Sequence, residues 1–158
     1  MHTQVMLRKA TLNDANSIAL LSEQLGYGYD VQSTKARLQA ILNHNEHCVF
    51  VATLSDKVVG WVHGFYMLRV ESDPFVEIGG LVVDENHRKM GIGIALIEEV
   101  KSWSAGKNCQ KLRVRCNIIR LESHEFYKQI GFTLNKEQKV FDMPLMPERG
   151  QEVQKTRY

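Results

Sequence analysis

The chain has 158 residues, of which 44% are hydrophobic and 24% are charged. These proportions are ordinary for a globular protein and argue against a disordered or fibrous chain. Twenty Lys and Arg residues against 18 Asp and Glu residues give a net charge of +2, which is too small to indicate a nucleic-acid partner. The length predicts a single domain over residues 1–146, followed by a polar, flexible tail over 147–158.

Cysteine usage and hydropathy indicate where the protein works. Three cysteines are present without a C-x-x-C pair, which is typical of a reducing compartment. No apolar run approaches the roughly 20 residues that span a bilayer, and the N-terminus carries no recognisable targeting segment. We therefore expect a cytoplasmic protein with no membrane partner.

The first half of the chain begins with a short apolar strand over 5–8. A helix follows, which Asn13 or Asp14 can cap and Gly26 can end. Ser33 can cap a second helix, so two helices are expected before the hydrophobic pattern changes its period.

A strand pattern then takes over. Apolar runs over 49–54 and 58–67 flank three polar residues and predict a hairpin. The segments that follow are a strand over 75–83, a helix over 92–103, a strand over 111–116, a helix over 121–130 and a last strand over 140–145. This order predicts a mixed α/β fold, with a largely antiparallel central sheet of about six to seven strands and four flanking helices.

The strongest local signal is the turn between the strand over 75–83 and the next helix. Gly91 and Gly93 let the backbone approach a ligand closely, and Arg88 and Lys89 place positive charge beside a helix N-terminus. This combination favours a pyrophosphate-binding turn over an ordinary strand-to-helix connection. A P-loop is excluded because the one Gly-Lys pair is followed by Asn108, and a dinucleotide fingerprint would need a third glycine where Leu96 stands.

Two segments resemble the GNAT superfamily of N-acetyltransferases. Residues 88–93 read Arg-Lys-Met-Gly-Ile-Gly and are similar to its R/Q-x-x-G-x-G/A signature. Residues 117–132 are similar to its N-x-x-N-x-x-A-x-x-F-Y-x-x-x-G-F block, with departures at Arg120 and Ser123. The order of elements also resembles the family over 5–145, which is nearly the whole chain.

The resemblance implies acetyl-CoA as co-substrate, a primary amine as acceptor, and a sheet that splays open between its fourth and fifth strands. It further implies that the backbone of 81–83 holds the pantetheine arm and that the backbone of 88–95 holds the pyrophosphate. Asn117, Phe126 and Tyr127 should lie along the arm and the sulfur. The cofactor-binding residues so implied are Leu81, Val82, Val83, Arg88, Lys89, Met90, Gly91, Ile92, Gly93, Ile94, Ala95, Asn117 and Phe126.

Direct attack of an amine on a thioester requires a neutral amine and a polarised carbonyl. Glu77 is the candidate base, at a position similar to that of the catalytic Glu in histone-type members, and strand alternation places it on one face with Phe75, Gly79 and Leu81. A chain of waters is the alternative, and so is a merely solvated Glu77. The Gly79-Gly80 pair indicates either a bulge that aims an N–H at the thioester oxygen or crowding against a neighbouring helix.

The same reaction needs a group that stabilises the leaving thiolate, and Tyr127 is the candidate acid. Because a tyrosine has a pKa of about 10 and a thiol about 8.5, a hydrogen bond to the developing thiolate is more plausible than full proton transfer. The alternative is an aromatic packing role beside Phe126.

Other reactive side chains offer weaker hypotheses. A covalent acyl-enzyme is disfavoured because two of the three cysteines, Cys48, Cys109 and Cys116, lie on predicted strands. No metal is expected, since His44 and His47 have no further ligand cluster beside them. His63 and His124 are interpreted as packing or substrate-wall residues. Arg113 and Arg115 alternate on one strand face, either in solvent or near cofactor phosphates.

The favoured function is therefore acetyl transfer from acetyl-CoA to a small-molecule amine by direct attack in a ternary complex. Asp30, Glu71 and Asp73 lie in predicted loops that could attract a cationic amine. Two alternatives stay open: a protein or peptide N-acetyltransferase, and a non-catalytic acyl-CoA-binding sensor. A homodimer also stays open.

Overall fold

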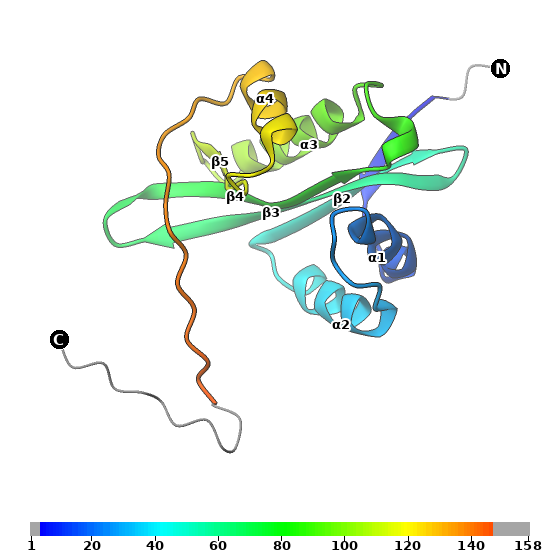
Figure 1. Ribbon diagram of the computed structural model, residues 1–158, viewed down its shortest axis with the longest axis horizontal. Helices are drawn as coiled ribbons and strands as arrows, with labels where there is room; N and C mark the ends of the chain where they lie inside the picture. The colour runs from blue at the N-terminus through cyan, green and yellow to red at the C-terminus, as the bar shows by residue number, and fades with distance from the viewer. Residues whose placement is uncertain (1–3, 147–158) are drawn as a thin grey trace.

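A five-stranded sheet organises residues 4–146, the part of the chain that the computed structural model describes (Figure 1). The strands lie in the order β1-β2-β3-β4-β5, and every neighbouring pair is antiparallel except β4 and β5, which are parallel. Their bounds are β1 Met6–Lys9, β2 His47–Leu54, β3 Lys57–Arg69, β4 Ser72–Val83 and β5 Leu112–Val114. The predicted hairpin around 55–57 is thus confirmed as β2 and β3.

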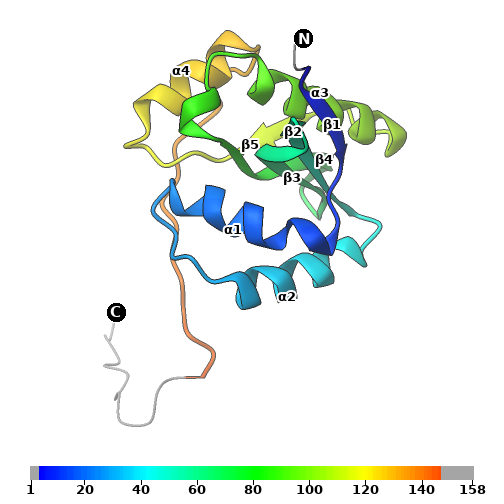
Figure 2. The same ribbon diagram turned by 90° about the vertical axis from the view of Figure 1, so that its right-hand side faces the viewer.

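Four α-helices cover the sheet, as the sequence predicts, and they divide between its two faces (Figure 2). Helices α1 (Ala15–Glu23) and α2 (Val31–Leu42) lie on one side, and α3 (Ile92–Gly106) and α4 (Leu121–Gln129) lie on the other. Two 3-10 turns, Leu12–Asp14 and Glu85–His87, precede α1 and α3. In the described residues no helix is long and apolar enough to cross a membrane.

Each face of the sheet has its own hydrophobic core. Between the sheet and α3, the fully buried side chains include Val62, Val76 and Leu96. Between the sheet and the α1–α2 pair, Val51 and Val82 pack against Ile18, Leu21 and Leu38. Alternating β4 residues supply both cores, because successive side chains of a strand point to opposite faces.

The cap of α2 differs from the sequence prediction. Asp30, not Ser33, precedes the helix, and its carboxylate accepts hydrogen bonds from the Ser33 backbone N–H at 3.0 Å and from the Ser33 hydroxyl at 2.7 Å. Both residue types cap helices well, so the pattern alone could not choose between them. Gly26 ends the turn after α1 with φ of +89°, as expected of a C-terminal glycine.

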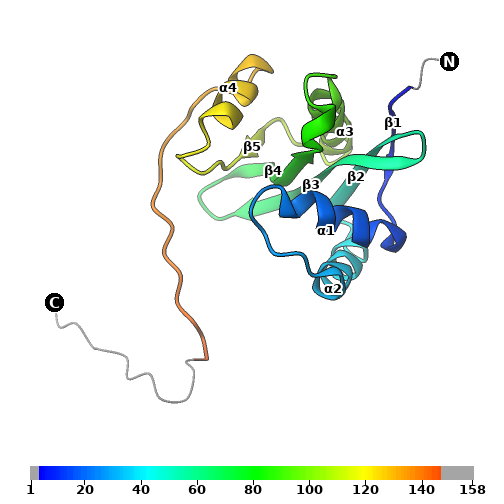
Figure 3. The same cartoon turned by 45° about the vertical axis from the view of Figure 1, so that its right-hand side comes forward.

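The sheet has fewer strands than the six to seven expected, because residues 140–145 form no strand. From Thr133 to Met146 the chain runs away from the body in an extended, exposed path (Figure 3). The alternation of apolar and polar residues there is a strand pattern, yet it pairs with none of the described strands, so β5 is left as an edge of only three residues. The predicted tail over 147–158 lies outside the described residues.

Candidate functional site

The turn from Arg88 to Gly91 delivers the chain from β4 to the start of α3. Lys89 and Gly91 both have left-handed backbones, with φ of +63° and +77°. Gly91 is the N-cap of α3, no side chain caps the helix, and a Cβ at Gly91 would meet nothing within 4 Å. The first N–H groups of a 15-residue helix therefore face an open surface with Arg88 and Lys89 exposed beside them, an arrangement suited to an anion.

Gly93 serves the packing of two helices. A Cβ at Gly93 would lie 2.9 Å from Cζ of Phe126, so the absence of a side chain lets α4 sit against the first turn of α3. Ile92 and Gly93 are buried, whereas Met90 and Ile94 are about half exposed on the open side. Of the predicted cradle over 88–95, the exposed backbone of the turn can meet a ligand, and Ile92 and Gly93 mainly hold the turn in place.

The outer edge of β4 opens beyond Ile78. Pairing with β5 covers only Val76, Glu77 and Ile78, and from Gly79 to Val83 the described residues place no strand on that side. This is the splay expected between the fourth and fifth strands. Val82 is 2% exposed and points into the core beneath, so only the backbone of 81–83 can face the opening.

Glu77 lies where the splay begins. It is 9% exposed, and its Oε1 accepts a hydrogen bond from Nε of Arg115 at 2.8 Å. Sequence reasoning left Arg115 either in solvent or near phosphates, but the structure makes it the ionic partner of Glu77. Arg113 packs on an aromatic ring instead, with its guanidinium carbon 4.4 Å from the centre of the Phe75 ring.

The two mid-strand glycines form a bulge and also accommodate crowded side chains. On β3, His63 pairs with Gly80 and Gly64 pairs with Ile78, so Gly79 is left without a register partner. A Cβ at Gly79 would lie 2.8 Å from Nδ1 of His63, and a Cβ at Gly80 would lie 2.7 Å from the Trp61 ring. The crowding thus comes from β3 side chains and not from a helix.

The bulge also corrects the face predicted for Leu81. The extra residue shifts the alternation, so Leu81 packs toward the α3 core while Glu77 and Gly79 stay on the opposite face with His63. A sequence pattern of period two has no means of locating this shift.

The segment after β5 brings Asn117, Phe126 and Tyr127 to the α3 side of the opening. The Asn117 side chain accepts from the Ile119 N–H at 3.1 Å and shapes the turn into α4. Tyr127 stacks edge-on against Phe126 and Phe132. Burial, with a smaller contribution from Cys116, raises the pKa of Tyr127 to about 12, so this phenol keeps its proton at neutral pH and can donate a hydrogen bond.

A polar network that the sequence did not reveal stabilises the chain just before the turn at 88–91. Asp84 is 7% exposed, accepts a hydrogen bond from Nε2 of Gln24 at 3.1 Å, and lies 2.7 Å from Nδ1 of His87. These bonds lower the pKa of Asp84, and the bond from Gln24 has the largest effect. Arg120 similarly donates to the Leu25 carbonyl at 3.1 Å. Partners 60 and 95 residues apart leave no local signal in a sequence.

Two of the three cysteines are poor nucleophiles in this structure. Burial raises the pKa of Cys48 to about 12 and also raises the pKa of Cys109. The described residues contain no group of three His, Cys, Asp or Glu side chains that could hold a metal.

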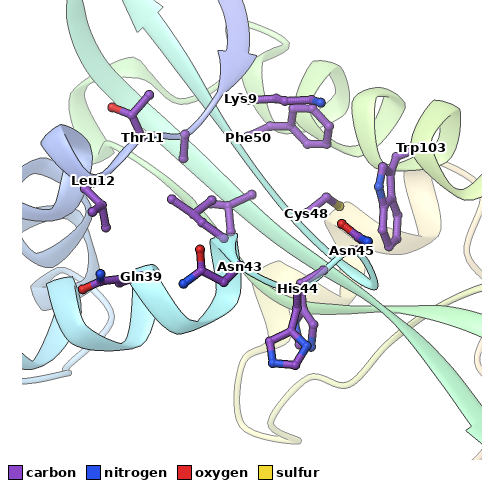
Figure 4. Close-up of a pocket in the computed structure, with 14 residues that line it drawn as sticks. Lys9, Thr11, Leu12, Gln39, Asn43, His44, Asn45, Cys48, Phe50 and Trp103 are labelled. Atoms are coloured by element: carbon purple, nitrogen blue, oxygen red, sulfur yellow. The ribbon is translucent and has the colours of Figure 1, made fainter.

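A separate cavity of about 580 Å³ lies off the end of β1, between the start of β2 and the end of α2 (Figure 4). It is lined by Lys9, Asn43, His44, Asn45, His47 and Trp103, among others. None of the predicted cofactor-binding residues lines it.

Comparison with known proteins agrees with this arrangement. A model of the acetyltransferase (GNAT) family matches residues 12–132. The chain is 26% identical over 103 residues to aminoglycoside N(6')-acetyltransferase type 1 of Serratia marcescens, covering 62% of this chain and 70% of that protein. It is 31% identical over 85 residues to N-acetylaspartate synthetase of Xenopus tropicalis, covering 54% of this chain and only 30% of that longer protein.

A solved structure shares the fold. The aminoglycoside N-acetyltransferase AAC(6')-Iy, crystallised with CoA, superposes with a TM-score of 0.81 at 19% identity, over 92% of this chain and 98% of that one.

Proposed function

The chain belongs to the acetyltransferase (GNAT) family, and from this premise we propose that it transfers the acetyl group of acetyl-CoA to a primary amine in a ternary complex. One observation carries the proposal. The β4–β5 pairing ends at Ile78, so an open strand edge begins at Gly79, next to the buried Glu77, and leads to the turn at Gly91, which suits an anion. A CoA thioester needs such an arrangement, with backbone groups for its arm and helix N–H groups for its pyrophosphate.

The proposed cofactor residues keep their predicted roles, except that Ile92 and Gly93 do not contact the ligand. The backbone of Leu81, Val82 and Val83 holds the arm, and the turn from Arg88 to Gly91 with Ile94 and Ala95 faces the pyrophosphate. Ile92 and Gly93 act by packing under that turn. Asn117 and Phe126 lie on the opposite side of the opening, and no metal takes part.

In the proposed reaction the amine nitrogen attacks the thioester carbonyl, the C–S bond breaks, and CoA leaves as its thiolate, which then takes a proton from water. The bulge at Gly79 offers a backbone N–H to the carbonyl oxygen, and Tyr127 donates a hydrogen bond to the departing sulfur. Glu77, which accepts a hydrogen bond from Arg115, borders the start of the open edge.

The acceptor that this site fits best is a small cationic amine. Support comes from the aminoglycoside N-acetyltransferases among the similar proteins. The loop acids contribute less than the sequence suggested, because Asp30 caps α2 and Glu71 lies 3.9 Å from Arg69 at the tip of a hairpin.

Thiol release from acetyl-CoA, followed across a panel of polyamines, aminoglycosides and lysine peptides, tests the proposal. We expect release with a small polycationic amine, together with a mass gain of one acetyl group on that amine. Release with lysine peptides alone would favour the protein-acetyltransferase alternative. Tight acetyl-CoA binding without release for any amine would contradict catalysis and favour a sensor.

The homodimer is proposed on a different observation. Six large apolar side chains of the segment 133–146 are each at least 72% exposed: Leu134, Val140, Phe141, Met143, Leu145 and Met146. A concentration of exposed large apolar side chains in one segment favours association with a partner surface. A second copy of the chain is the partner we propose for it.

A further inference from the structure

Two histidines on neighbouring strands, which the proposed reaction leaves unused, are joined directly. His47 Nδ1, at the start of β2, lies 2.9 Å from Nε2 of His63 on β3. The two rings are nearly parallel, with an interplanar angle of 14°, and Phe65 flanks both. The contact uses one nitrogen of each ring, so each histidine has its second nitrogen available at the other end of the pair.

The inner nitrogen of the pair faces the bulge. Nδ1 of His63 lies 2.8 Å from the point where a Cβ on Gly79 would stand, so only a glycine leaves this nitrogen uncovered. Gly79 is exposed, and it lies two residues beyond Glu77 on the same face. The inner end of the histidine pair therefore opens beside the place where the proposed reaction puts the thioester carbonyl.

The outer end of the pair reaches solvent. His47 lines the cavity of about 580 Å³ at the start of β2, where Asn43, Asn45, His44 and Lys9 also lie (Figure 4). The pair thus connects the acceptor side of the sheet to a separate, water-accessible cavity at its edge.

We propose that His63 and His47 form a proton relay that carries the amine proton from the bulge to this cavity. The inference rests on the proposed acetyl transfer. As the N–C bond forms and the nitrogen gains positive charge, its proton passes to Nδ1 of His63. The proton on Nε2 of His63 passes to Nδ1 of His47, and the proton on Nε2 of His47 leaves to water. The electrons of the C–S bond leave with the thiolate, so the relay exports one proton per acetyl group transferred.

The chemistry of the neighbours favours histidine over Glu77 for this step. The Glu77 carboxylate is held by Arg115 at 2.8 Å, and among the described residues no further hydrogen-bond partner stands beside it to take a proton onward. An imidazole accepts at one nitrogen while it donates from the other, which suits it to relay. The titratable groups that act on the pair are His44 and Glu46, beside His47. Lys9 lines the same cavity as His47, and Glu77 stands opposite Phe65 on β4.

Burial keeps both rings neutral, as a relay requires. Desolvation, and then the charge of His47, lower the pKa of His63 to about 4. Desolvation also lowers the pKa of His47, with His44 adding to the effect and Glu46 opposing it. A proton that reaches His63 therefore does not remain there but moves outward to the better-solvated ring.

The first test is the tautomer in the resting enzyme. The relay requires His63 to carry its proton on Nε2 and to leave Nδ1 free. Nitrogen-15 NMR of histidine-labelled protein reads this directly, with His63→Phe and His47→Phe proteins providing the assignments. A proton found on Nδ1 of His63 would overturn the relay, because that nitrogen would then be a donor to the carbonyl and not an acceptor.

The second test is kinetic. His47→Phe keeps an aromatic ring beside Phe65 but removes both nitrogens. His44→Phe is the matched control because the His44 ring lies beside His47, tilted by 59°, without a hydrogen bond to it. With the best amine of the panel, we expect turnover of His47→Phe to fall at least tenfold while the Kd for acetyl-CoA is unchanged. His44→Phe should stay within twofold of the wild type.

Rescue separates proton transfer from packing. His63→Ala leaves space beside Gly79, so added imidazole should restore a substantial part of its lost turnover. No rescue in a folded protein that binds acetyl-CoA normally, or wild-type turnover in His47→Phe, would overturn the relay while leaving the proposed acetyl transfer intact. Failure of the wild type to release thiol with any amine would instead overturn the transfer, and the relay with it.

Discussion

Gly91 combines a left-handed backbone with open space above it, and the two properties have different consequences. Its φ of +77° makes any side chain there costly in folding free energy, and the open space is where the proposed pyrophosphate lies. A substitution therefore affects both stability and binding, and only a control with the same strain can separate the two effects.

Gly91→Ala should weaken acetyl-CoA binding at least tenfold, or about 1.4 kcal/mol, because the Cβ enters the ligand's space. Gly26→Ala is the matched control, since Gly26 has φ of +89° and equally open surroundings but lies in the loop after α1. Calorimetry should find binding unchanged in the control, with a similar fall in melting temperature in both proteins. Equal affinities in the two variants would remove the turn from the site.

Tyr127→Phe keeps the ring and its contacts with Phe126 and Phe132 but removes the hydroxyl. Since the pKa of Tyr127 is about 12, proton transfer to a thiolate would be uphill by roughly 5 kcal/mol, and its contribution should be a hydrogen bond. Turnover should fall about 100-fold, or roughly 2.7 kcal/mol, with acetyl-CoA affinity unchanged. Steady-state kinetics with a parallel binding measurement checks this. A turnover number equal to the wild type's would leave Tyr127 with a packing role only.

At the scale of elements, the paired strands β2 and β3 carry a pH dependence of stability. The unfolded chain protonates His63 near pH 6.5, whereas the folded protein keeps it neutral down to about pH 4. The unfolded state therefore binds more protons within this window, so stability is complete above pH 6.5 and falls as the pH drops toward 4. His47 acts in the same direction, while the lowered pKa values of Asp14 and Asp84 act at lower pH.

His63→Phe should therefore flatten the stability profile between pH 6.5 and 4, where the wild type loses up to about 3 kcal/mol through this residue. Urea unfolding at a series of pH values measures the difference. Parallel profiles for the two proteins would show that His63 is not held neutral by the fold.

The elements were predictable from the sequence where periodicity is strong and local. The hairpin of β2 and β3, the long amphipathic α3 and the glycine-stopped α1 and α4 all follow from side-chain spacing and turn residues. The turn before α3 was predictable for the same reason, since its glycines and basic residues form one contiguous motif, and its binding of a pyrophosphate stays a proposal.

The remaining features depend on contacts between distant residues. The ion pair of Glu77 with Arg115, the hydrogen bond of Gln24 with Asp84 and the His47–His63 contact join residues 16 to 60 positions apart. The bulge at Gly79 moved Leu81 to the other face, and a strand pattern over 140–145 found no partner among the described strands. Such outcomes depend on tertiary packing, which overrides local propensity.

At the scale of the whole molecule, we predict that two copies of the chain associate through the exposed apolar side chains of the segment 133–146. Phe141→Asp places a charge in its 87% exposed apolar surface and should convert a dimer to a monomer, as measured by light scattering. Leu68→Asp is the control, because Leu68 is also exposed, at 68%, but lies near the tip of the β3–β4 hairpin. A monomeric wild-type protein, or dissociation of the control as well, would contradict this role for the segment.

The central claim is that acetyl-CoA lies along the open edge of β4 with its pyrophosphate at the start of α3. Hydrogen–deuterium exchange with and without saturating acetyl-CoA tests it most directly, since backbone amides that bind the ligand become protected. We predict protection over residues 81–95, with a smaller effect over 117–127 and none over 39–50, where the separate cavity lies. Protection confined to 39–50, or the absence of any change over 81–95 at saturation, would contradict the account.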